Sequence, residues 1–149
     1  MISLEKIAAD IAAELQEIFS TVRICAVQNP EQFLTEIRAI NPEKLPAVLI
    51  VFDGFAFTAE STVREDRLTL VVLDEFRNAS DERALELFKL PGKIMEIFPP
   101  DGRDLNGAWI APEDCSAAST VIDYAVLAIG VVCKQGVLFR SVSKSTVTQ

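Results

Sequence analysis

Hydrophobic residues at the start of the chain recur every three or four positions. Between residues 3 and 19 the apolar positions share one helical face. They are Leu4, Ile7, Ala8, Ile11, Ala12, Leu15, Ile18 and Phe19. Ser3 precedes this stripe and is a favourable N-cap, and Glu5 adds negative charge at the positive end of a helix. The pattern predicts an amphipathic helix over 3–19 that packs on a sheet.

A strand and a second helix are predicted next. The β-branched segment 21–27 is typical of a strand. Asn29 is a candidate cap for the helix that follows, and Pro30 suits its first position. The apolar face of this helix consists of Phe33, Ile37 and Ile40. Two prolines then predict a loop over 41–46.

Two long apolar segments, 46–53 and 65–76, predict strands that are covered on both sides. The segment between them, 54–64, contains a glycine and two phenylalanines. We expect it to form a hairpin connection or an extended β-arm rather than a tight two-residue turn.

The second half of the chain predicts a helix followed by two strands. The helix covers 80–98, and Pro91 followed by Gly92 is expected to kink or split it, because proline has no N–H to donate. The later segments are a loop over 99–107 and strands over about 108–117 and 121–134.

The order of elements predicts an α+β fold in one domain over 1–136. A mostly antiparallel sheet is flanked by two or three helices and carries a protruding β-hairpin. Residues 137–149 lose the apolar pattern and are expected to form a short C-terminal strand or a loose tail.

Composition and charge narrow the function. The chain has 149 residues and a net charge of −8. This charge disfavours non-specific nucleic-acid binding and docking on anionic membranes, which both need Lys and Arg.

The start of the chain has no continuous apolar segment of the signal-peptide kind. Three cysteines without C-x-x-C spacing are expected to be buried or half-buried thiols in strands.

Catalytic motifs are missing from the sequence. It contains no histidine, which removes Ser-His and Cys-His nucleophilic machinery and histidine zinc sites. Gly-rich phosphate loops are also missing. We therefore expect a protein that is not an enzyme and has no catalytic, cofactor or metal site.

Carboxylates leave one enzymatic alternative open. Asp53, Glu65 and Asp74 lie at predicted strand ends, where metal-dependent nucleases gather acids. The two strands contain no lysine, and the overall charge is unsuited to a nucleic-acid substrate. Asp101 and Asp104 lack the spacing of a calcium loop and favour a polar turn. Trp109 and Tyr124 are expected to pack in the core or at an interface.

The hairpin carries a resemblance to a known family. The residues concerned are Leu45-Pro46-Ala47-Val48, Gly54, Phe57-Thr58, Glu60 and the returning segment 68–76. This pattern resembles the tail terminator proteins of long-tailed bacteriophages of the lambda type. The order of elements over about 1–135 is similar too. The chain also resembles Mu-like prophage tail-region proteins of similar size.

The resemblance implies a structural role in virion assembly. Such proteins form a ring, expected to be a hexamer, that caps the tail tube and contacts the tail-tube and head-completion proteins. DNA passes through the ring only as cargo, and no cofactor or membrane is involved. The implied location is the bacterial cytoplasm and then the virion tail.

The hairpin residues are the candidate subunit contacts in this interpretation. They are Phe55, Phe57, Thr58, Glu60 and Arg64. Aromatic residues are enriched at interface hot spots, although Phe55 and Phe57 could equally point into their own core. Three alternatives stay open: another phage neck or tail adaptor, a metal-dependent nuclease or other small carboxylate-based enzyme, and a ligand-binding α+β domain.

Overall fold

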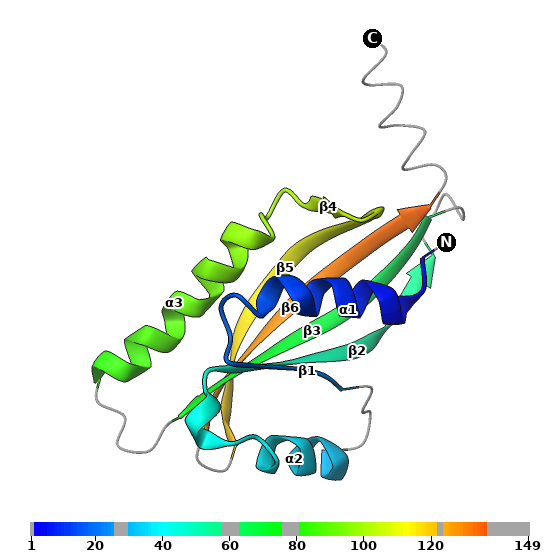
Figure 1. The fold of residues 1–149 in the computed structure, drawn as a ribbon. Helices are drawn as coiled ribbons and strands as arrows, with labels where there is room; N and C mark the ends of the chain where they lie inside the picture. The colour runs from blue at the N-terminus through cyan, green and yellow to red at the C-terminus, as the bar shows by residue number, and fades with distance from the viewer. Residues whose placement is uncertain (1, 26–29, 58–62, 76–80, 122–123, 137–149) are drawn as a thin grey trace.

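The computed structural model describes residues 2–25, 30–57, 63–75, 81–121 and 124–136 (Figure 1). Its helices are α1 (Leu4–Leu15), α2 (Pro30–Arg38), the short 3-10 helix η1 (Pro42–Lys44) and α3 (Asp81–Ile97). Its strands are β1 (Thr21–Cys25), β2 (Ala47–Phe57), β3 (Val63–Glu75), β4 (Arg103–Leu105), β5 (Ala108–Val121) and β6 (Tyr124–Gly136).

The six strands of the described chain form one curved sheet in the order β1-β2-β3-β6-β5-β4. Every neighbouring pair is antiparallel except β1 and β2. The predicted α+β class, with a mostly antiparallel sheet and flanking α-helices, is confirmed, and the described residues form three α-helices.

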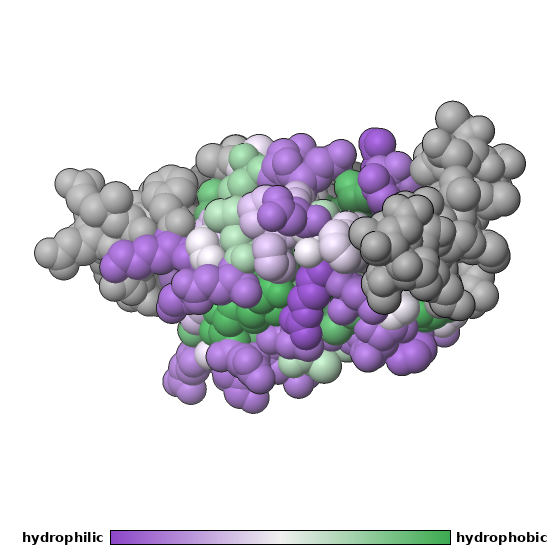
Figure 2. Space-filling view, turned by 90° about the horizontal axis from the view of Figure 1, so that it is seen from above, coloured by the Kyte–Doolittle hydropathy of each residue, from purple (hydrophilic) through white to green (hydrophobic). Residues whose placement is uncertain are grey.

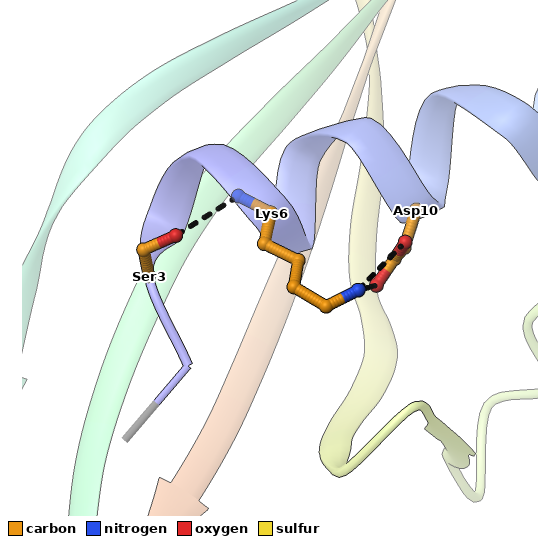
Figure 3. A network of polar contacts seen from close by, with 3 residues as sticks. All are labelled: Ser3, Lys6 and Asp10. Carbon is orange, nitrogen blue, oxygen red and sulfur yellow. Dashed lines mark hydrogen bonds and ion pairs between the residues drawn. The ribbon is translucent and has the colours of Figure 1, made fainter.

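Helix α1 lies across one face of the sheet, as its apolar stripe predicts (Figure 1). The side chain of Ser3 accepts a hydrogen bond from the Lys6 backbone N–H at 3.3 Å, which caps the first turn. One turn further on, Nζ of Lys6 lies 3.2 Å from Oδ2 of Asp10 on the solvent side (Figure 3). The buried face consists of Ile7, Ala8, Ile11, Ala12 and Leu15.

Alternate residues of each strand face opposite sides of the sheet, and both sides are covered near β2. Val48 and Ile50 join the larger core, which lies under α1 and α3. Ala47 and Leu49 join a smaller core with Ile37 of α2 on the other face. This double coverage explains why β2 has a continuous apolar sequence.

The β2–β3 hairpin is part of the sheet over its described length. The two strands pair as far as Phe57 and Arg64, and the first residue of β3 also pairs with the last residue of β6. Much of the predicted connection over 54–64 is therefore strand. A protruding hairpin is not confirmed, since residues 58–62, where a projection would have to lie, are outside the described residues.

The sequence predicts that the third α-helix kinks or splits at Pro91 and Gly92. The prediction of a split is wrong. Helix α3 is assigned as one element from Asp81 to Ile97 with Pro91 inside it. The helix loses one backbone hydrogen bond at the proline. Leu90 and Ile94, which flank the proline, are buried in the same core.

The loop predicted over 99–107 contains a strand that the sequence did not reveal. Strand β4 is three residues long, and the turn at Asn106 and Gly107, both with positive φ, joins it to β5. Arg103 of β4 donates to Glu14 of α1 at 3.0 Å, which fixes the short strand to the helix layer. Strands β5 and β6 extend beyond their predicted ends. The predicted tail, 137–149, lies outside the described residues.

Candidate assembly surface

The structure describes the predicted contact residues of the hairpin to different extents. The backbones of Phe55 and Phe57 lie in β2, in the stretch that pairs with β3. The side chains of both phenylalanines, and Thr58 and Glu60 altogether, lie outside what the structure describes. Their role as subunit contacts stays a prediction. Arg64 is the one member of the set whose side chain is described.

Arg64 holds a carboxylate that is completely buried. Its Nε donates to Oδ1 of Asp66 at 3.0 Å, and Asp66 is 0% exposed. The second oxygen of Asp66, Oδ2, has no hydrogen-bond partner in the described part of the chain. A buried carboxylate is costly unless a cation or hydrogen bonds compensate it. Arg64 therefore stabilises the fold of its own chain.

A second buried polar group fixes the start of the chain, and sequence reasoning missed it. The side-chain amide of Gln135 accepts from the Ile2 N–H and donates to the Ile2 carbonyl, both at 2.8 Å. Gln135 is 2% exposed. Its burial could have been predicted from its position. Every second residue of β6 faces the core, including Val131 and Cys133, and Gln135 is the next residue in this series.

The three cysteines are free thiols in different environments. Cys25 and Cys133 are buried, as predicted, but Cys115 on β5 is exposed, so the prediction is wrong for that residue. Burial raises the pKa of Cys133 to about 12, and the Asp66 carboxylate on the neighbouring strand adds to this. Partial burial of its sulfur and the neighbouring Asp114 carboxylate raise the pKa of Cys115. None of these shifts favours a reactive thiolate.

The structure does not bring the three acids of the nuclease alternative together. Glu65 and Asp74 are nine positions apart on β3, roughly 30 Å in an extended strand, and they face opposite sides of the sheet. Asp53 lies at a bulge in β2 and accepts a hydrogen bond from the Thr69 hydroxyl. Within the described residues, no three Asp, Glu, Cys or His side chains are placed to hold a metal ion.

The polar turn predicted around Asp101 and Asp104 lies at the start of β4, and Asp104 is part of that strand. Asp101 and Asp104 are both exposed. Gly102 between them has φ +94°, and a Cβ there would lie 2.1 Å from Nε1 of Trp109. Trp109 thus packs directly on the turn; it is half-buried and belongs to neither core cluster, so a place in the core is not confirmed, and a role at an interface stays a prediction. The side chain of Tyr124 is outside what the structure describes.

The sheet ends in two edges that differ from each other. Strand β1 forms one edge, beside a surface hollow of about 490 Å³ lined by Thr21, Arg23 and Lys44 among others. At the other edge β4 pairs with β5 only as far as Ile110. A pocket of about 180 Å³ lies between α3 and this part of β5. Seen from above, hydrophobic surface is visible between hydrophilic margins (Figure 2).

Comparison with known protein families and with curated proteins finds no match. In the described part of the chain, no helix has both the length and the apolar character that a membrane span requires.

Proposed function

We propose that this chain is a structural subunit that assembles into a closed ring, of the kind that the resemblance to phage tail terminators implies. The observation that carries the proposal is the pair of unlike edges on one sheet. A ring is built from heterologous contacts, in which one surface of each copy meets a different surface of the next. The sheet offers two such surfaces at opposite ends.

The buried polar groups support a structural role as well. Arg64 and Asp66 compensate each other, and Gln135 is occupied by the backbone of Ile2. The acids of the nuclease alternative are spread along β3 and across its two faces. The described polar side chains therefore support a role in stabilising the fold rather than a role in catalysis.

In this proposal the ring caps the tail tube and joins it to the head-completion proteins. The subunits accumulate in the host cytoplasm before they enter the virion tail. DNA passes through the ring without being bound tightly.

Light scattering coupled to size-exclusion chromatography tests the proposal. A hexameric ring has a mass near six times the 16.4 kDa of one chain. Purified tail tubes provide the second measurement, because a terminator binds their ends and stops their growth. A chain that stays monomeric at high concentration and leaves tube growth unchanged contradicts the proposal.

A further inference from the structure

Two large hydrophobic side chains are exposed among the described residues, and they lie at opposite ends of the sheet. Ile24 of β1 is 52% exposed, and Met95 of α3, beside β5, is 42% exposed. Four strand spacings separate β1 from β5, about 20 Å. A single copy therefore cannot bury one against the other.

The edge at β1 presents an apolar knob with basic groups beside it. Ile24 is paired in register with Ile50, so it lies on the α1 side of the sheet. Arg23 points to the other side, where its guanidinium lies 3.3 Å from Glu36 of α2. Lys44 is exposed next to β1, and its backbone carbonyl accepts from the Thr21 hydroxyl.

The edge at β5 presents an apolar pocket with acidic groups beside it. The pocket has a volume of about 180 Å³, and its apolar lining includes Pro91, Met95, Pro100, Pro112 and Ile129. It lies on the same side of the sheet as α1, because Ile129 and α3 share the core with that helix. Glu113 and Asp114 are exposed at its margin.

The edge at β5 is unsuited to backbone pairing with another strand. Pro112 lacks an N–H, and the register shifts between Pro112 and Asp114. Prolines, charges and bulges are the features that prevent strand addition at an edge. A partner at this edge must therefore bind through side chains.

We propose that Ile24 of one copy inserts into the α3–β5 pocket of the next copy, the pocket lined by Pro91, Met95 and Ile129. Lys44, which is exposed beside β1, then faces Glu113 and Asp114 across the contact. The inference rests on the proposed ring and names its contact surfaces.

Size and charge both support this occupant. A cavity of about 150 Å³ accommodates benzene, so the pocket has room for the four-carbon side chain of Ile24. A knob that fits a pocket elsewhere on the same molecule produces a heterologous contact. The chain carries a net charge of −8, so copies repel each other in general. The basic and acidic margins offset this repulsion locally.

A disulfide experiment tests the contact, because Cys115 lines the pocket and is exposed. In an Ile24→Cys variant the new thiol is expected to bond to Cys115 of the next copy under mild oxidation. Non-reducing electrophoresis should then show a ladder of covalent oligomers. The control variant combines Ile24→Cys with Cys115→Ser and should lose the ladder.

Light scattering on the wild-type protein separates this inference from the ring itself, because Ile24→Cys shortens the side chain that is proposed to insert. A ring that forms without producing the ladder overturns the contact and leaves the ring. A covalent dimer that persists in the Cys115→Ser control indicates a symmetric contact between β1 strands, and it also overturns the inference. A wild-type protein that does not assemble, together with an Ile24→Cys variant that gives no ladder, contradicts both proposals.

Charge reversal provides an independent measurement. Lys44→Glu alone and Glu113→Lys alone should each raise the dissociation constant of self-association about two- to fivefold. Together they should restore the wild-type value, because the pair is then reversed. Equal losses in the single variants without recovery in the double variant contradict the proposed facing of these groups.

Discussion

At the scale of single residues, Arg64 is predicted to matter for stability. Arg64→Ala removes the described cation beside Asp66, a carboxylate with no exposed surface. We expect a loss of about 3 kcal/mol in the free energy of unfolding, measured with urea. The double variant with Asp66→Asn should recover part of this loss, because the uncompensated charge is then gone. If Arg64→Ala and the double variant lose the same free energy of unfolding, the uncompensated charge of Asp66 is not the cause of the loss.

The raised pKa of Cys133 predicts that the folded protein loses stability at alkaline pH. Its pKa rises from an ordinary value of 9.0 to about 12 in the folded chain. Above pH 9 the unfolded chain loses this proton while the folded chain keeps it, so stability falls as pH rises towards 12. The expected contribution is about 1.4 kcal/mol per pH unit.

Urea unfolding at pH 8 and pH 10 measures this effect. A Cys133→Ala variant is the control, since it shares the other titrating groups and lacks this thiol. It should be less stable at pH 8 but lose less stability by pH 10. Parallel pH profiles for the two proteins contradict the assignment to Cys133.

At the scale of elements, two glycines are expected to respond oppositely to alanine. A Cβ at Gly92 in α3 meets nothing within 4 Å, so Gly92→Ala should stabilise the helix by about 0.5–1 kcal/mol. A Cβ at Gly130 in β6 would lie 2.5 Å from Oδ1 of Asp114, which accepts the Gly130 N–H at 3.2 Å. Gly130→Ala should therefore lower the melting temperature, and a scan of both variants checks the two signs.

Periodicity predicted the elements better than their ends and connections. The stripe of α1 and the apolar runs of β2 and β3 were readable because burial imposes a helical spacing on the first and removes alternation from the others. The continuation of α3 past Pro91 could not be predicted from the sequence, because the tertiary packing of Leu90 and Ile94 outweighs the tendency of proline to end a helix. Strand β4 was missed because three residues carry no periodicity.

The candidate surfaces were less predictable than the fold. The sequence pointed to the aromatic hairpin, whereas Ile24 and Met95 gave no signal in an apolar strand and an amphipathic helix. Their exposure depends on which strands end at the edges of the sheet and on what the helices leave uncovered. Both are properties of the tertiary arrangement rather than of local sequence.

At the scale of the whole molecule, the charge predicts weak contact with DNA. A subunit with a net charge of −8 gains little from releasing counterions from phosphate. We expect the assembled protein to cause no shift of duplex DNA in a gel at physiological salt. Binding that weakens steeply with added salt would reveal a basic surface and contradict passage without adhesion.

Head-to-tail assembly also predicts how two defective subunits behave together. Ile24→Asp disables the knob and leaves the pocket, while Met95→Asp disables the pocket and leaves the knob. Each variant alone should be monomeric. An equimolar mixture should form dimers of twice 16.4 kDa and nothing larger, because each pair has one working contact and two disabled ends.

The mixture should associate more weakly than the wild type, since one contact lacks the gain from ring closure. Analytical ultracentrifugation over a concentration series measures this difference. A symmetric contact gives a different result, because a substitution at its centre disables both partners equally. A mixture that stays monomeric, or a single variant that dimerises alone, therefore excludes the contact between Ile24 and the α3–β5 pocket.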